Sequence, residues 1–307
     1  MLGALLGLIS AAAFGGNSII TRRGMMRVSP NYFAVLTVFT GPVFFSLIAA
    51  VMGELSRLKA FSWQVYFFFA IAGIGHFALG RNWAYRSIQL IGATRANIVT
   101  SLSPIITTIL AVTILRESIS ALRAIGILFA LTGPLLILLK EEVAAKAGQL
   151  KGGQRGKELD RPTLYKGILC GAGTMVFWGS SAIFIKLGLE EGGSPIAGSL
   201  IAYVFASLAI LPSVSLRKEQ RREILHSDRA SLGTALISGL TTNTAQLLRY
   251  VALANGSAIV VSLMLQTQTL WVLIFAFFFY RSHESFSRWV LMGSGFLIIG
   301  TLLVLIS

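Results

Sequence analysis

The stretch F177-W-G-S-S-A-I-F-I-K-L-G188 decides how the rest of the chain is interpreted, because a similar string, F14-G-G-N-S-I-I-T-R-R-G24, stands near the beginning. Each string places an aromatic residue and a glycine ahead of an apolar run that ends in a cation, Lys186 or Arg22. Both strings lie within segments that approach the roughly 20 apolar residues needed to cross a bilayer. The similarity indicates two copies of one ancestral unit.

The composition points to lipid as the solvent of this chain. Of its 307 residues, 55% are hydrophobic and only 12% are charged, whereas a soluble domain has about 25% charged residues. This supply of charge is too small to cover a water-facing surface, so an integral membrane protein is predicted. The net charge of +14 arises mainly from loops between apolar runs, as the positive-inside rule expects, and does not indicate nucleic-acid binding.

Apolar runs of membrane-spanning length occur at ten places along the chain. They are approximately 2–20, 31–52, 63–85, 93–115, 120–139, 166–189, 195–215, 231–253, 257–280 and 287–306. A polar, Gly-rich segment separates the fifth run from the sixth. The predicted organisation is therefore a first five-helix repeat over 1–140, a linker over 141–165 and a second five-helix repeat over 166–307.

Further pairs of residues recur in the same order in both halves. Ser29-Pro30 corresponds to Ser194-Pro195, and Glu117-Ser-Ile-Ser120 corresponds to Glu284-Ser-Phe-Ser287. Five spans per half is an odd number, so the second half must enter the membrane from the opposite side. The sequence thus predicts an all-α membrane protein of ten transmembrane helices, arranged as two inverted repeats, a layout common among secondary transporters.

With these features the sequence resembles the drug/metabolite transporter superfamily, specifically its ten-span EamA-type members. The resemblance covers essentially the whole chain and rests on the paired aromatic-Gly…cation segments, the Pro-containing run 93–115 followed by Glu117, and the Gly-rich runs 120–139 and 287–306. It implies two bundles around a central cavity, lined by the first, third and fourth spans and their partners. Residues 266–269 have no proline where Pro104 stands in the first half, so equal kinks are not expected.

Polar residues in the middle of 93–115 and 257–280 are the first candidate substrate site. They are Ser101 and Ser103, beside the helix-kinking Pro104, and Gln266 and Gln268. Interrupted helices at corresponding positions of inverted halves are a pointer to a transport site. The alternative is that these side chains only bridge helices.

The runs 63–85 and 231–253 supply further candidates for substrate binding. They are His76, Arg81 and Asn82 in the first run, and Asn243 and Gln246 in the second. Basic residues inside a membrane span suggest function. Alternatively, His76 is a helix-bridging hydrogen-bond partner, and Arg81 and Arg249 reach the membrane interface.

Lys186 is the last candidate, and two explanations of its position remain open. Its charge either snorkels to the interface or faces the cavity, where it attracts a substrate carboxylate or phosphate. No span interior contains Asp or Glu, so coupling through a buried carboxylate is not expected. Facilitated flux, exchange or a proton route through His76 remain.

The predicted function is a secondary transporter, an exporter or exchanger, of small polar metabolites such as amino acids or related zwitterionic or anionic compounds. No catalytic motif, cofactor or metal site is predicted. The expected partners are a small-molecule substrate and the lipid bilayer of a prokaryotic inner membrane, with the protein a monomer. The charge of the loops places both termini outside, whereas the resemblance places them inside. The alternative function is a non-transporting membrane scaffold or assembly subunit.

Overall fold

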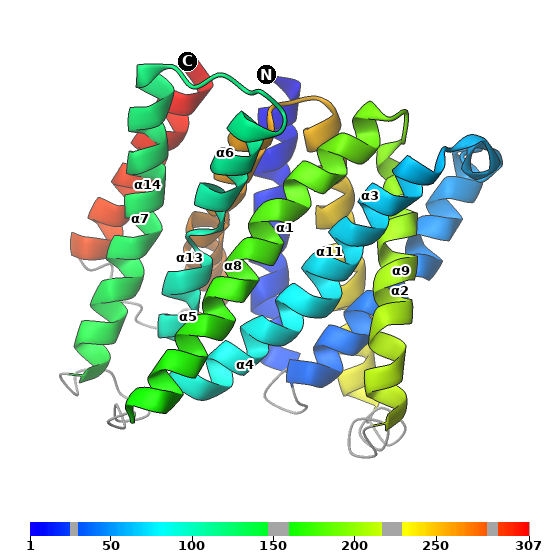
Figure 1. Cartoon of the computed structure of the whole chain (residues 1–307). Helices are drawn as coiled ribbons and strands as arrows, with labels where there is room; N and C mark the ends of the chain where they lie inside the picture. The colour runs from blue at the N-terminus through cyan, green and yellow to red at the C-terminus, as the bar shows by residue number, and fades with distance from the viewer. Residues whose placement is uncertain (25–29, 147–159, 217–228, 281–287, 307) are drawn as a thin grey trace.

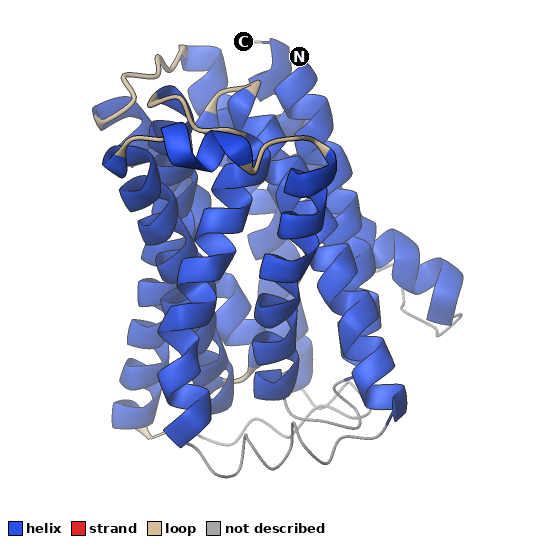
Figure 2. Cartoon of the chain, turned by 90° about the vertical axis from the view of Figure 1, so that its right-hand side faces the viewer, coloured by secondary structure: helices blue, strands red, loops and turns tan. Residues whose placement is uncertain are grey.

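The computed structural model of the chain describes residues 1–24, 30–146, 160–216, 229–280 and 288–306. These residues form helices joined by turns and loops, and no strand occurs among them (Figure 2). The first half contains α1 (Leu2–Gly24), α2 (Pro30–Val51), η1 (Ser56–Ala60), α3 (Trp63–Gly73), η2 (Ile74–Gly80), α4 (Arg81–Ile91), α5 (Ala93–Thr100), α6 (Ser103–Thr113) and α7 (Ala121–Lys146). The second half contains α8 (Arg161–Glu190), α9 (Pro195–Leu216), α11 (Arg229–Ala254), α12 (Ala258–Gln266), α13 (Gln268–Tyr280) and α14 (Arg288–Ile306).

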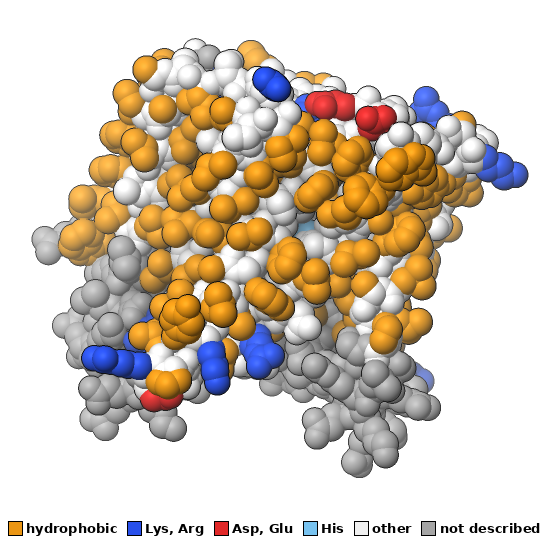
Figure 3. All heavy atoms as spheres, viewed as in Figure 1, with side chains coloured by type: hydrophobic (Ala, Val, Ile, Leu, Met, Phe, Trp, Pro, Cys, Tyr) orange, Lys and Arg blue, Asp and Glu red, His pale blue; other side chains and the backbone are white. Residues whose placement is uncertain are grey.

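Seven helical segments of the described chain are long and apolar enough to cross a membrane, and two shorter apolar helices accompany them. On the face shown in Figure 3, apolar side chains cover the middle of the molecule, while Lys, Arg, Asp and Glu lie towards its two ends. Such a band is the surface that hydrocarbon requires. α11 is in neither group because it carries Asn243, Gln246 and Arg249, and it buries all three against neighbouring helices.

Helices of the two halves pack against each other in equivalent pairs. α1 packs on α11 and on α12 and α13, whereas α8 packs on α3, η2 and α4 and on α5 and α6. α2 packs on α9, and α7 packs on α14. The contacts of α1 with helices of the second half are thus equivalent to the contacts of α8 with helices of the first half. This equivalence is expected of two copies of one unit.

The first helices of the two halves run in opposite directions (Figure 1). α1 begins at the upper end of the view, beside the N-terminus, whereas α8 begins at the lower end. The N-terminus and the C-terminus lie at the same end of the molecule, which we call the terminal end (Figures 1 and 2).

The glycine of the repeated motif has the same role in both halves. A Cβ on Gly15 would lie 2.6 Å from the Cβ of Trp271 in α13, and one on Gly179 would lie 2.5 Å from the carbonyl oxygen of Ser103 in α6. Only glycine therefore lets α1 and α8 approach the broken helices of the opposite half this closely.

Both broken helices are interrupted at corresponding places, although the second has no proline at its break. The first break lies at 101–102, just before Pro104, and the second lies at Thr267. Proline explains the first break, because it has no N–H to donate to an earlier carbonyl. In the second, the Thr267 hydroxyl donates to the carbonyl of Met264 at 2.6 Å, a local bond that competes with the helix.

The helices also extend into the predicted linker from both sides, since α7 ends at Lys146 and α8 begins at Arg161. Residues 147–159, in the middle of that linker, lie outside the described residues. The early start of α8 follows from Asp160, whose carboxylate accepts a hydrogen bond from the backbone N–H of Thr163 at 3.4 Å. Hydrogen bonding to Thr163 lowers the pKa of Asp160 below its usual value, as expected for a helix N-cap.

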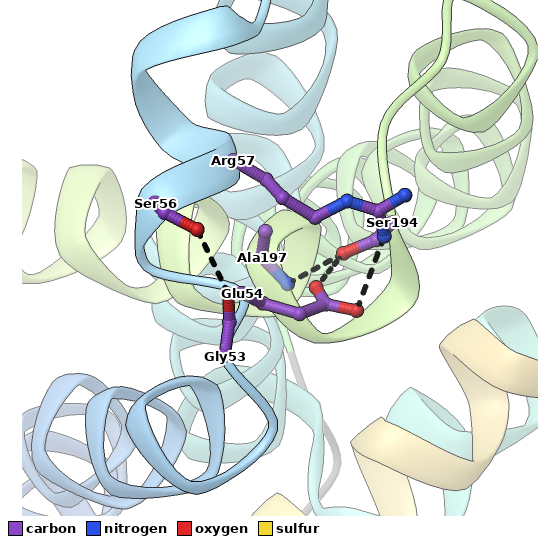
Figure 4. Close-up of polar contacts among 6 residues, drawn as sticks. All are labelled: Gly53, Glu54, Ser56, Arg57, Ser194 and Ala197. Carbon is purple, nitrogen blue, oxygen red and sulfur yellow. Dashed lines mark hydrogen bonds and ion pairs between the residues drawn. The ribbon is translucent and has the colours of Figure 1, made fainter.

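Two glutamates of the first half join it to helix starts of the second half. Glu54 accepts a hydrogen bond from Ser194, the residue before α9, and lies 3.7 Å from Arg57 (Figure 4). Glu117 accepts from the backbone N–H groups of Ala258 and Ile259 at 2.7 and 3.3 Å, and from Ser257. These carboxylates satisfy N–H groups that a helix start leaves unpaired, directly or through a capping serine.

Candidate functional site

The candidate site is built around a wide turn in the third span. α3 and α4 are joined by the π-helical segment η2, which contains His76. Trp178 of α8 donates its indole N–H to the carbonyl of His76 at 3.2 Å, and Thr174 donates to the carbonyl of Gly80 at 3.1 Å. Trp178 of the repeated motif and Thr174, which precedes that motif, thus stabilise a helix irregularity of the kind often found at functional sites.

Four polar side chains meet at this point, and we call them the His76 cluster: His76 of η2, Ser181 of α8, and Gln246 and Arg249 of α11. Arg249 donates to the Ser181 hydroxyl at 2.7 Å and to the side-chain oxygen of Gln246 at 3.4 Å. His76 Nδ1 lies 3.1 Å from Ser181, and His76 Nε2 lies 3.4 Å from Gln246 Nε2. The cluster therefore joins η2 of the first half to two helices of the second.

The charge of Arg249 is buried in this cluster without a counter-charge. Its exposed fraction is 5%, and its Nε has no hydrogen-bond partner. No described acidic side chain pairs with it; the ion pair seen in the described chain is that of Glu54 and Arg57 at the terminal end. Burying an unpaired charge costs several kcal/mol, and an anion bound beside Arg249 would lower that cost.

A second cation and an aromatic wall lie close to the cluster. The rings of Phe77 and Trp178 lie 4.8 and 5.7 Å from the ring of His76, centroid to centroid. The guanidinium of Arg81 lies 5.6 Å from the centroid of the Phe77 ring and donates to the Thr37 hydroxyl at 2.7 Å. Apolar rings beside two cations lower the local dielectric and strengthen attraction for an anion.

The structure brings together only some of the candidates that the sequence indicated. His76 and Gln246 are in the cluster. Asn243 is fully buried and donates to Thr40 at 3.2 Å, while its side-chain oxygen has no partner. Asn82 is exposed next to Arg81. We therefore expect Asn243 and Asn82 to contact a substrate only if the helices that carry them move.

The amide residues of the second broken helix bridge helices. Gln266 donates to the backbone carbonyl of Ser101 at 2.5 Å, and Gln268 donates to the Ser18 hydroxyl at 3.3 Å. The Ser101 carbonyl has no partner within its own helix, because the backbone N–H of Ile105 donates to Leu102 instead. The carbonyl of Ser103 accepts from Thr107 at 3.4 Å, and Pro104 is buried at the start of α6. A substrate role for these residues stays a prediction.

Lys186, the cation of the repeated motif, lies near the terminal end of α8. Its amine donates to the carbonyl of Gly256 at 3.1 Å, in the turn between α11 and α12. A cation there complements the carbonyl groups left free at the C-terminal end of α11. The side chain of its counterpart, Arg22, lies outside the described residues. Direct substrate contact by Lys186 stays a prediction.

Sequence reasoning did not select Ser181, and it left Arg249 free to reach the membrane interface. Ser181 stands in an apolar stretch where a serine usually packs against a helix backbone. In α11, polar residues follow one another from Thr241 to Thr244, so the helical pattern does not reveal which face is internal. The signal that could have found Ser181 is its position one turn beyond Phe177 in the repeated motif.

The comparisons with known proteins agree with this architecture. The family model for EamA-like transporters matches residues 1–139 and 165–306. The chain belongs to the EamA-like transporter family. This EamA-like protein is therefore a member of a family of membrane transporters, and its many apolar helices make it a multi-pass membrane protein.

The fold of this EamA-like protein also occurs among solved structures. One crystal structure matches with a TM-score of 0.78 and 14% identity, covering 99% of this chain and 96% of the other. At that identity the likeness concerns the fold alone. No curated protein matches the chain.

Proposed function

We propose that this EamA-like protein is a secondary transporter of small polar metabolites that carry an anionic group, such as amino acids or related zwitterionic or anionic compounds. It acts as an exporter or exchanger in the plasma membrane of a prokaryote. The ten helical segments each cross the membrane, and the two inverted halves enclose a central site that opens to one side at a time.

The single observation that carries this proposal is the buried guanidinium of Arg249. It has an unpaired Nε and no acidic partner among the described residues. A substrate carboxylate can accept two parallel hydrogen bonds from a guanidinium and also supplies the missing negative charge. Substrate binding would thus relieve the cost of burying the cation.

The remaining predicted residues have subordinate roles in this proposal. Gln246 and His76 adjoin the guanidinium, and Arg81 adds positive potential at one side of the site. Asn82, Ser101, Ser103, Lys186, Asn243, Gln266 and Gln268 are proposed to line the path during opening, with Pro104 at the helix break. Bulky aromatic neighbours favour a small substrate.

The orientation follows from charge. The loops that follow the first, third, fifth, seventh and ninth spans hold most of the Lys and Arg residues, so the positive-inside rule favours a cytoplasmic location for these loops and an outside location for both termini.

Counterflow in proteoliposomes tests the proposal. Vesicles loaded with a mixture of unlabelled amino acids are expected to take up each member of the substrate class in labelled form with saturation. Arg249→Gln is expected to reduce the initial rate at subsaturating substrate by at least about 30-fold, because breaking a buried charge pair costs about 2–5 kcal/mol.

The matched control is Arg57→Gln, since the Arg57 side chain is 64% exposed at the terminal end. This variant is expected to transport at the wild-type rate. Transport by Arg249→Gln equal to wild type would refute the anion site. Absence of saturable uptake of every amino acid tested would refute that substrate class and favour the scaffold alternative.

A further inference from the structure

We infer that His76 couples proton uptake to anion binding at Arg249, so that the substrate anion and a proton enter the site together. This inference rests on the proposed function and deepens it, because it names the coupling ion. It is carried by the contacts within the His76 cluster, which indicate a tautomer of His76 and show that its ring lies beside the buried charge of Arg249.

The hydroxyl of Ser181 fixes one side of the imidazole. Ser181 has a single proton, and it donates this proton to the carbonyl of Trp178 at 2.8 Å. It therefore acts as acceptor towards Arg249 at 2.7 Å and towards His76 Nδ1 at 3.1 Å. A hydroxyl can accept two hydrogen bonds while donating one. Arg249 Nη1 also lies 3.5 Å from His76 Nδ1, and because a guanidinium can only donate, that contact is not a hydrogen bond when Nδ1 is protonated. The contact with Ser181 is the shorter one, at 3.1 Å, and we infer from it that Nδ1 of His76 carries the proton.

The amide of Gln246 fixes the other side. Its oxygen accepts from Arg249 at 3.4 Å, so its nitrogen faces His76 Nε2, also at 3.4 Å. An amide nitrogen can only donate, and Nε2 must therefore be unprotonated. The opposite tautomer would require Gln246 to turn its oxygen towards His76, which would leave its nitrogen facing the donors of Arg249.

Protonation of His76 therefore acts directly on Arg249. With both ring nitrogens protonated, Nε2 needs an acceptor, and Gln246 supplies one by rotating its amide by half a turn. The amide nitrogen then faces Arg249, and two donors cannot pair. Arg249 loses its bond to Gln246 and presents Nη1, together with the already unpaired Nε, to an acceptor from outside the cluster.

The charges around His76 require that acceptor to be an anion. The facing groups are Arg249 of α11 and Arg81 of α4, with Tyr203 of α9 behind the Phe77 ring and Tyr250 beside Arg249. The nearest cation of α8, Lys186, is bonded to Gly256. A proton on His76 adds a positive charge beside two others, and an anion on Arg249 offsets it. By linkage, each ligand strengthens the binding of the other.

Imidazole ¹⁵N NMR tests the inference on the full chain in nanodiscs. The other two histidines, His226 and His283, are replaced by Gln so that His76 alone is observed, and acetate is the minimal carboxylate probe. Without acetate, the ring is expected to carry its proton on Nδ1. Acetate is expected to raise the pH at which the ring takes up its second proton by about one unit or more.

Two variants make the result decisive. In Arg249→Gln the effect of acetate is expected to disappear. In Gln246→Glu the ring is expected to be doubly protonated at neutral pH without acetate, because a carboxylate can only accept from Nε2. A proton on Nε2 in the wild-type protein, or second-proton uptake that acetate does not change, overturns the inference. The spectra do not depend on transport. If acetate raises the pH of second-proton uptake at His76 but counterflow shows no transport, the proposed function is refuted and the inference about His76 is not.

Discussion

At the scale of single residues, Gln266 shows how the broken helices remain stable. Its side-chain amide donates a hydrogen bond to the carbonyl of Ser101. The break at 101–102, just before Pro104, leaves that carbonyl without a partner in its own helix. A buried carbonyl that loses its donor costs about 1–3 kcal/mol. The side chain that the sequence suggested for substrate binding thus has a structural partner across the two halves.

The variant Gln266→Ala is therefore expected to lower the free energy of unfolding in detergent micelles by about 1–3 kcal/mol. The matched control is Gln268→Ala, which removes a longer bond of 3.3 Å to the Ser18 hydroxyl and is expected to cost less than about 1 kcal/mol. Equal losses in the two variants, measured by chemical denaturation, would contradict this role of the Ser101 carbonyl.

Residue identity predicted part of the site, and burial decided the rest. His76 and Gln246 could be chosen from the sequence because polar side chains inside a membrane span are costly. Arg249 lies close to the end of its apolar run, where a long side chain could reach water. Only the packing of α8 and η2 around α11 shows that it does not.

At the scale of helices, the existence and the approximate ends of most helices could be predicted from the sequence, because long apolar runs in a membrane protein must be helical. Breaks were harder to predict, since Thr267 interrupts its helix without proline. The composition of residues 74–80 does not indicate the π-helical turn at η2. It depends on donors from Trp178 and Thr174, which lie far away in the sequence.

The crossing of α7 and α14 gives a prediction at this scale. A Cβ on Gly300 would lie 2.2 Å from the backbone nitrogen of Ala130, whereas one on Gly295, in the same helix, would meet no atom within 4 Å. Gly300→Ala is expected to cost about 1–3 kcal/mol of stability, since backbone atoms must separate. Gly295→Ala is expected to be neutral or stabilising by up to about 1 kcal/mol.

Thermal unfolding of the two glycine variants in the same detergent measures the difference. A lower midpoint for Gly300→Ala and an unchanged or higher midpoint for Gly295→Ala agree with a tightly packed α7–α14 pair. Equal midpoints would show that the two helices do not meet at Gly300.

At the scale of the whole molecule, the repeat detected in the sequence reappears as equivalent packing of the two halves. The Gly15 and Gly179 contacts show that equivalent motif residues serve equivalent places. The halves differ where the His76 cluster lies, because His76 comes from the first half and Ser181, Gln246 and Arg249 from the second. Duplication explains the scaffold, and divergence between the copies explains the site.

The sidedness of equivalent positions tests the central claim of two inverted halves most directly. Leu2 and Lys166 are equivalent by the repeat, and both side chains are exposed. In a Cys170→Ser background, Leu2→Cys and Lys166→Cys are labelled in intact cells with a membrane-impermeant maleimide, with Glu190→Cys at the terminal end as reference. The account predicts that Leu2→Cys and Glu190→Cys react from one side and Lys166→Cys only from the other. Reaction of Leu2→Cys and Lys166→Cys from the same side would contradict the inverted arrangement.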